Sequence, residues 1–121
     1  MSKYRQNLGN WGENAAENFL VSKGHLIVGR NVRTPYGEID IISRDGDILV
    51  FVEVKTRSNE QFGLPEEAIT RNKQIHMLNA AQAFLQTNPD FDGDWRIDVI
   101  AVRKKPGVNS PEIIHFENVL F

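Results

Sequence analysis

The chain has 121 residues, a mass of 13.8 kDa and a formal net charge of -2. Its length suits one domain, and 40% hydrophobic with 25% charged residues is typical of a globular protein. The absence of cysteine excludes a disulfide framework, a Cys-based zinc site and a Cys nucleophile. The pI of 5.9 argues against a generally basic nucleic-acid coat protein, but it leaves room for a local basic groove.

Hydrophobic patterning predicts a helix, three strands, a second helix and two more strands. No apolar run approaches the ~18 residues of a membrane-spanning helix, and the first residues are polar, so we expect a cytoplasmic location and no membrane partner. The expected elements are a helix over residues 8–23, strands over 25–30, 38–44 and 48–55, a helix capped by Thr70 and ended by Asn88-Pro89, and strands over 95–102 and 112–116. This order predicts an α/β fold with a central mixed β-sheet flanked by helices, in one domain over residues 1–121.

The connections and the last strand add four expectations. Asp45-Gly46-Asp47 is a tight hairpin signal, so the second and third strands should be neighbours. Pro65 is expected to open a helical segment, and the last strand, 112–116, is expected at an edge of the sheet. The loop over residues 56–63 follows the third strand and is either a recognition loop or a plain connector.

Polar residues interrupt the two strands joined by the hairpin. Strand alternation places Glu38, Asp40 and Ile42 on one face of the second strand. In the third strand it places Phe51, Glu53, Lys55 and Arg57 on one face, with Val50, Val52 and Val54 turned into a core. The hairpin then allows Asp40 and Glu53 to lie side by side.

Two adjacent carboxylates raise each other's pKa, and a divalent cation removes that conflict. Mg²⁺ takes hard oxygen ligands from one or two carboxylates, and the backbone carbonyl of Val54 adds another donor. Such an ion supplies what phosphodiester hydrolysis needs. Lys55 would hold the attacking water or stabilise charge on the phosphate, and Arg57 would bind a flanking phosphate. The alternative is a structural salt-bridge ladder across the two strands. Spacing alone leaves both open.

Longer motifs carry a resemblance to a known family. Gly37-Glu38-Ile39-Asp40 followed by the run 51–57 (FVEVKTR) resembles the PD-(D/E)xK nuclease signature. More closely, the chain is similar to the small bacterial YraN-like family of predicted endonucleases. The matching features are Gly12-Glu13 with Ala16, Arg30-Asn31, the GEID strand, the FVEVKTR strand, Phe62-Gly63 with Pro65, Lys73 and the run 96–99.

This resemblance implies a restriction-endonuclease-like fold, similar to that of archaeal Holliday-junction resolvases. It implies that Asp40 and Glu53 are metal-binding acids and that Lys55 is the catalytic lysine. Glu13 matches a helix glutamate that acts as an accessory ligand or positions water; otherwise it is an exposed helix residue. Ile39 stands where the proline of the signature would be, as in many members of that superfamily.

Several further residues have two readings. Glu38 is either an additional metal ligand or a surface acid at the start of a strand. Four cations are candidates for a nucleic-acid-binding rim and are otherwise solvated surface charges: Arg30, Arg33, Arg71 and Lys73. The three histidines, His25, His76 and His115, show no metal-ligand spacing and are given no role.

The function favoured by these features is a Mg²⁺- or Mn²⁺-dependent endonuclease that hydrolyses phosphodiester bonds in DNA, with branched DNA among the candidate substrates. A catalytically inactive nucleic-acid-binding module on the same fold is the alternative. A third hypothesis is a protein-interaction domain that uses the strand and apolar end over residues 113–121. Junction cleavage would need paired active sites, so a homodimer is one expected assembly.

Overall fold

The computed structural model describes residues 3–57, 69–105 and 107–120. Two helices and five strands lie in these ranges: α1 Lys3–Ser22, β1 Leu26–Thr34, β2 Gly37–Asp45, β3 Ile48–Arg57, α3 Arg71–Thr87, β4 Trp95–Arg103 and β5 Glu112–Phe116. The expected α/β order and mixed sheet are therefore confirmed. Among the described residues, no helix is long and apolar enough to cross a membrane.

The sheet has the strand order β1-β2-β3-β4-β5, so neighbours in the chain are also neighbours in space. All pairs are antiparallel except β3 and β4, which run parallel from Leu49↔Trp95 to Arg57↔Arg103. A parallel pair needs a crossover, and α3 lies in that connection. The hairpin between β2 and β3 and the edge position of β5 are both as expected.

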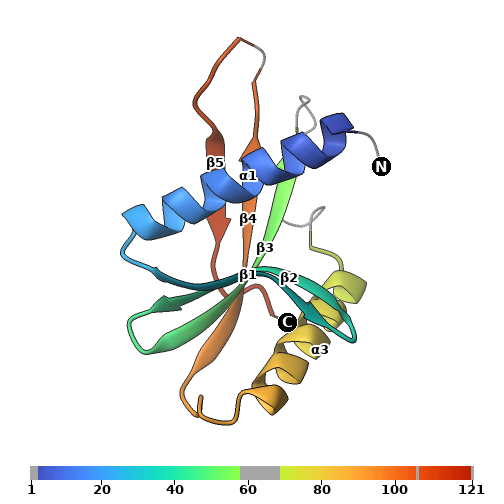
Figure 1. Ribbon diagram of the computed structural model, residues 1–121, viewed down its shortest axis with the longest axis vertical. Helices are drawn as coiled ribbons and strands as arrows, with labels where there is room; N and C mark the ends of the chain where they lie inside the picture. The colour runs from blue at the N-terminus through green and yellow to red at the C-terminus, as the bar shows by residue number, and fades with distance from the viewer. Residues whose placement is uncertain (1–2, 58–68, 106, 121) are drawn as a thin grey trace.

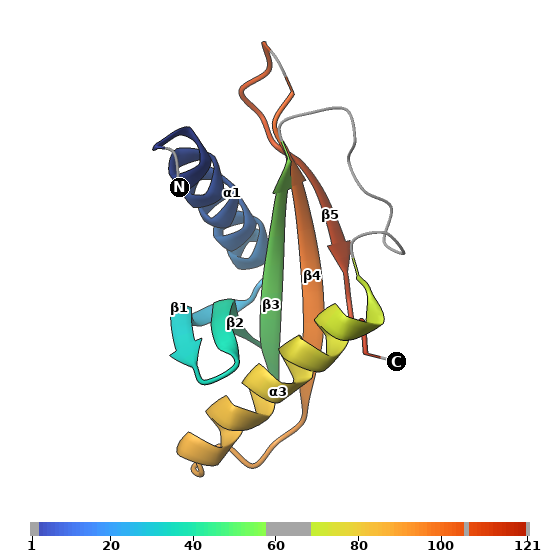
Figure 2. The same cartoon turned by 90° about the vertical axis from the view of Figure 1, so that its right-hand side faces the viewer.

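The two helices cover opposite faces of the sheet, as Figure 2 shows. On one face, α1 buries Ala16 and Leu20 against a cluster that includes Ile41, Val50 and Val52. On the other face, α3 contributes buried alanines to a cluster whose sheet residues are Ile39, Ile42, Leu49, Phe51 and Ile97. Val50 and Val52 thus face α1 while Phe51 faces α3, as strand alternation predicts for β3.

Alternation fails in β2 near Asp40. Ile39 and Ile42 both pack in the α3-side cluster, although strict alternation puts them on opposite faces, and Ile41 packs on the α1 side. The strict alternation expected along this strand is therefore interrupted between Ile39 and Ile42, although Glu38 and Asp40 still line the pocket on the α3 side, where Ile42 packs. The ladder between β2 and β3 reaches only from Asp45↔Ile48 to Ile41↔Val52. Beyond it β2 leaves β3, and β1 and β2 run across the molecule while β3 and β4 follow its long axis (Figure 1).

Element boundaries differ from the expected ones where local signals are weak. Helix α1 begins at Lys3 rather than Leu8, and β1 continues to Thr34, four residues past its apolar run. Thr70 caps α3 as expected, because its side chain accepts a hydrogen bond from the Lys73 amide. The features expected at Phe62, Gly63 and Pro65, and most of the 56–63 loop, lie outside the described residues.

The apolar C-terminal end folds back onto the domain. The Val119 amide donates to the Ile97 carbonyl at 2.8 Å, and Gln74 of α3 donates to the Val119 carbonyl at 2.9 Å. Val119 and Leu120 pack against the α3-side cluster. These two residues are thus part of the core of the chain, which removes most of the motive for an interaction surface there.

Helix α1 lies close to β3 at Gly12. A Cβ at this position would clash with the hydroxyl of Thr56 and lie 2.9 Å from the Thr56 Cβ, whereas a Cβ at Gly9 would meet nothing within 4 Å. We expect Gly12→Ala to lower the free energy of unfolding by about 1–3 kcal/mol through overpacking. The matched variant Gly9→Ala should raise it by about 0.5–1 kcal/mol, because alanine favours helix. Urea unfolding measures both, and shifts of the same sign would contradict this account of the α1–β3 contact.

Candidate active site

Asp40 lies where β2 and β3 part. Its Oδ2 accepts a hydrogen bond from the amide of Val54 at 2.8 Å, and Val54 follows the last backbone pair of the two strands, Ile41↔Val52, along β3. The side chain thus replaces the backbone acceptor that β2 no longer offers. Because the amide and carbonyl of a strand residue point to the same side, the Val54 carbonyl also faces this gap. The structure therefore directs one carboxylate and one carbonyl into the same opening between the strands.

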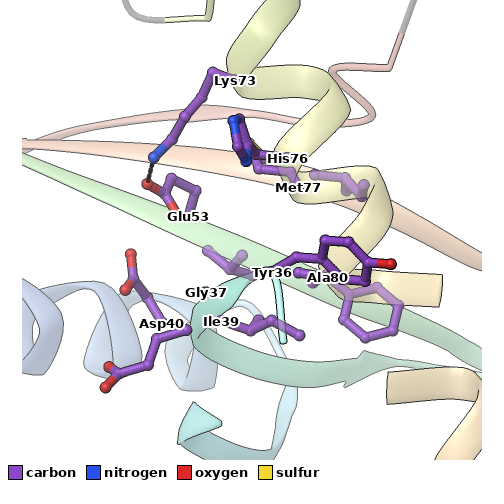
Figure 3. Close-up of a pocket in the computed structure, with 13 residues that line it drawn as sticks. Tyr36, Gly37, Ile39, Asp40, Glu53, Lys73, His76, Met77 and Ala80 are labelled. Carbon is purple, nitrogen blue, oxygen red and sulfur yellow. Dashed lines mark ion pairs between the residues drawn. The ribbon is translucent and has the colours of Figure 1, made fainter. Parts of the chain in front are cut away.

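Glu53 and two lysines lie beside this opening, and Figure 3 shows the pair of Glu53 with Lys73. Glu53 Oε1 lies 2.6 Å from Lys73 Nζ, which reaches across from α3, and 3.7 Å from Lys55 Nζ on its own strand. The Glu53 side chain is only 15% exposed, so this ion pair is held largely out of water. Of the four cations that are candidates for a nucleic-acid-binding rim, Lys73 is joined directly to the Glu53 carboxylate.

The Asp40 carboxyl is under electrostatic strain. Burial, and then the negative charge of Glu53, raise its pKa from 3.8 to about 7, against the stabilising hydrogen bond from the Val54 amide. The charge of Glu13 raises the pKa further. A carboxyl in this state is stabilised by any cation that enters the gap, and perturbed acids of this kind cluster at functional sites.

The pKa values of the two lysines are shifted in opposite directions. Burial, together with the nearby charge of Lys73, lowers the pKa of Lys55. Burial acts in the same direction on Lys73, but the hydrogen bond and charge of Glu53 outweigh it and raise its pKa. Lys55 is therefore the amine that more readily gives up its proton, and Lys73 is the fixed positive charge.

Glu13 reaches the site from α1 and is oriented by β1. Its Oε1 accepts hydrogen bonds from Asn31 Nδ2 at 3.0 Å and from Arg30 Nη2 at 3.3 Å. Arg30 also donates to Asn14 at 2.7 Å and approaches Glu17 at 3.6 Å. Glu13 is thus a held, largely buried acid rather than an exposed helix residue, and Arg30 positions it. Asn31 has a φ of 50°, a left-handed conformation that is uncommon outside glycine.

The other candidate residues lie farther out. Glu38 lines the pocket beside Asp40, but its carboxylate is 3.8 Å from the guanidinium of Arg33, which is 90% exposed. This is a surface pair of small energetic value. Arg57 is exposed at the end of β3, where it donates to the Thr56 carbonyl at 3.2 Å, and Arg71 is exposed at the start of α3.

A second polar cluster, which sequence reasoning missed, lies on the α1 side of the sheet. Asp98 is fully buried and accepts hydrogen bonds from Arg96 Nε at 3.0 Å, His115 Nε2 at 2.8 Å and the Asn118 amide at 2.9 Å. His115 was given no role, because only the β4–β5 pairing brings it to Asp98. His25 is likewise buried and contacts Ser43 at 2.9 Å.

Asp98, His115 and Glu117 are close enough to hold a metal ion, yet the cluster is already satisfied. Burial alone would raise the pKa of Asp98, but the hydrogen bonds from His115, Arg96 and the Asn118 amide hold it below its ordinary value. Arg96 also pairs with Asp45 at 3.2 Å and with Glu117 at 3.1 Å. We therefore regard this cluster as a structural connection between β4 and the C-terminal segment.

The fold and the site define an α/β protein with a carboxylate–lysine site where two strands part. The profile of the family described as "Uncharacterised protein family UPF0102" matches residues 12–102, and the chain belongs to this family. A UPF0102 protein of Syntrophotalea carbinolica is 43% identical over 116 residues, covering 96% of this chain and 93% of the relative. One of Desulfosudis oleivorans is 45% identical over 114 residues, covering 94% and 91%. The expected family membership is thus confirmed, and the matched range contains all the site residues from Glu13 to Lys73.

The raised pKa of Asp40 predicts that Asp40→Asn changes the free energy of unfolding in metal-free buffer by an amount that depends on pH. The variant keeps an oxygen that accepts from the Val54 amide but removes the charge. The raised pKa means that folded wild-type protein binds more protons than unfolded protein between pH 3.8 and about 7, so wild type loses stability as pH rises through this window. The variant should be about as stable as wild type at pH 4 and about 2–4 kcal/mol more stable at pH 8, at roughly 1.4 kcal/mol per pKa unit.

Urea unfolding in EDTA at several pH values measures this difference. Asp47→Asn is the matched control, because it makes the same substitution at an exposed residue of the β2–β3 hairpin. A stability difference for Asp40→Asn that does not change with pH would show that Asp40 is an ordinary, solvated carboxylate.

The hydrogen-bonded cluster around Asp98 predicts that Asp98→Asn destabilises the protein, whereas Asp40→Asn stabilises it at high pH. Loss of this charge leaves Arg96 and His115 without their buried partner, so the free energy of unfolding should fall by about 3 kcal/mol. Titration calorimetry should show that this variant binds Mn²⁺ as wild type does. A variant of unchanged stability that no longer binds Mn²⁺ would instead locate the metal at Asp98.

Proposed function

We propose that this protein is a Mg²⁺- or Mn²⁺-dependent endonuclease that hydrolyses phosphodiester bonds in DNA, of the PD-(D/E)xK, restriction-endonuclease-like superfamily. The observation that carries the proposal is the convergence of Asp40, Glu53 and Lys55 at the point where β2 and β3 part. There the pKa of Asp40 is raised to about 7 by burial and by Glu53. A divalent cation resolves this conflict, and the resemblance assigns the same three residues to phosphodiester hydrolysis.

The donor set fits a hard cation. Asp40 and Glu53 supply carboxylate oxygens and Val54 supplies a carbonyl oxygen, which are the ligands that Mg²⁺ and Mn²⁺ prefer. Glu13 is close enough to affect the pKa of Asp40 and is the accessory acid of the set, whereas Glu38 lies at the rim with Arg33. When bound, the ion would polarise the phosphate and activate water.

The remaining steps belong to side chains of this chain. Lys55, 26% exposed and 3.7 Å from Glu53 Oε1, donates hydrogen bonds to the attacking water or to the phosphate oxygen on which charge develops. Lys73 neutralises and orients Glu53 through the 2.6 Å ion pair. Arg30 and Asn31 hold Glu13 in place, while Arg33, Arg57 and Arg71 lie on exposed surface where flanking phosphates would be bound.

Cleavage of a panel of end-labelled nucleic acids tests the proposal. The panel contains duplex, single-stranded, flap and four-way-junction DNA together with RNA, each in Mg²⁺, Mn²⁺ or EDTA. We expect cutting by wild type in Mg²⁺ or Mn²⁺ only. Asp40→Asn and Lys55→Ala should each reduce the rate at least about 100-fold, because metal binding and stabilisation of the transition-state charge are lost.

Matched controls change the same residue types outside the site. Asp92→Asn and Lys104→Ala alter exposed residues and should cut at the wild-type rate. Circular dichroism verifies that all variants are folded. Cutting by Asp40→Asn at the wild-type rate would contradict the proposal. A folded wild type that binds DNA without metal and cuts nothing would favour the inactive binding module, whose affinity should fall steeply with salt.

A further inference from the structure

A pocket of about 270 Å³ adjoins the candidate active site between β2, β3 and α3 (Figure 3). One end of it is the charged site itself, formed by Asp40, Glu53 and Lys73. The other end is apolar, and its wall is made of side chains of the α3-side core: Ile39, Phe51, Met77, Ala80 and Ile97. Phosphodiester hydrolysis uses the charged end and leaves the apolar end without a role.

Two rings stand at the mouth of this pocket. Tyr36, in the turn between β1 and β2, is 55% exposed, and His76 is exposed on α3. They come from segments on opposite sides of the opening, as Figure 3 shows. An exposed tyrosine beside an apolar cavity is a surface on which a flat, aromatic ligand stacks.

The size and chemistry of the pocket fit one nucleobase. Its volume is just below the roughly 300–1,000 Å³ of sites that hold drug-sized ligands. A base has two apolar π-faces and polar edges, and it is joined through its sugar to a phosphate. The faces of the base match the apolar wall and the two rings of the pocket. The attached phosphate matches the charged end at Asp40 and Glu53. The Met77 thioether adds a favourable contact with an aromatic ring.

We infer that this pocket receives one unpaired nucleobase of the strand whose phosphate lies at Asp40 and Glu53. This inference rests on the proposed function and names its substrate class: DNA with an unpaired nucleotide beside the cleaved bond, as in a single strand, a flap or a branch. A base within continuous duplex must first be unstacked and unpaired, which costs a few kcal/mol. Continuous duplex is therefore the poorer substrate.

Equilibrium binding by the Asp40→Asn variant tests the inference without cleavage. The probes are single-stranded oligonucleotides in which one abasic nucleotide is moved along the strand, compared with the intact strand and with continuous duplex. We expect the abasic nucleotide to weaken binding about 10-fold at one position only, as loss of one stacked base does. Continuous duplex should bind at least about 10-fold more weakly than the intact single strand.

A second variant links that position to the pocket. Tyr36→Ala, made in the same background, should weaken binding of the intact strand about 10-fold and leave binding of the abasic strand unchanged. Tyr36→Phe is the matched control that keeps the ring, and it should bind like the parent. A 2-aminopurine placed at the sensitive position should lose fluorescence on binding in the parent and not in Tyr36→Ala.

Each contrary outcome has a distinct meaning. If neither an abasic nucleotide at any position nor Tyr36→Ala changes the affinity, or if one of them does not, the inference about the pocket is wrong. The nuclease proposal is then still decided by its cleavage assay. Duplex that binds as tightly as single strand also overturns the inference about the pocket. A wild-type protein that neither binds nor cuts any member of the panel overturns the proposed function and the pocket together.

Discussion

The hydrogen bond from the Val54 amide to Asp40 is the interaction on which the arrangement of the site depends. Backbone pairing between β2 and β3 ends at Ile41↔Val52, while β3 continues beside β4 to Arg57. The strand that continues is left with an amide facing the gap, and a carboxylate from the strand that leaves accepts it. A buried amide without an acceptor would be costly, so the departure of β2 and the placement of Asp40 are one structural event. The gap that results is also the space in which Glu53, Lys55 and Lys73 meet.

Two aspartates of the sheet, the fully buried Asp98 and the half-buried Asp40, show how differently this fold stabilises a negative charge. Asp98 has a guanidinium, an imidazole and an amide as donors, and its pKa is held below the ordinary value. Asp40 has one amide donor and two nearby acids, and its pKa is raised. The first arrangement stabilises the folded chain at neutral pH, and the second opposes it. The arrangement around Asp40 becomes stabilising only when a cation binds there. For this reason Asp40, rather than Asp98, marks the candidate site.

The pocket extends this reasoning from charge to shape. The same turn of β2 that carries Asp40 into the gap moves Ile39 to the α3 side of the sheet and places Tyr36 at the rim. The charged and apolar ends of the pocket thus share one structural origin, and α3 closes both with Lys73 and Met77. This continuity supports the proposal that the two ends form one binding surface for a phosphate and the base attached to it.

Local patterns in the sequence determined much of this protein. Alternating apolar residues identified β3 and its two faces, Asp-Gly identified the hairpin, and Thr70 identified the start of α3. The hairpin made β2 and β3 neighbours, because a short turn forces adjacent strands to pair, and this allowed Asp40 and Glu53 to lie close together. The motif around them was enough to indicate the family, which the match over residues 12–102 confirms.

Only the tertiary structure decided how these residues interact. The break in alternation at Asp40 depends on where β2 leaves β3, which no local pattern reports because register is set by distant packing. The contact of Arg30 with Glu13 depends on the packing of β1 against α1. The contact of Lys73 with Glu53 depends on the way α3 crosses the sheet. The cluster of His25, Asp98 and His115 joins residues separated by up to 90 positions, so their spacing carried no signal. Secondary structure follows from short-range periodicity, whereas a site assembled from several elements exists only when they pack.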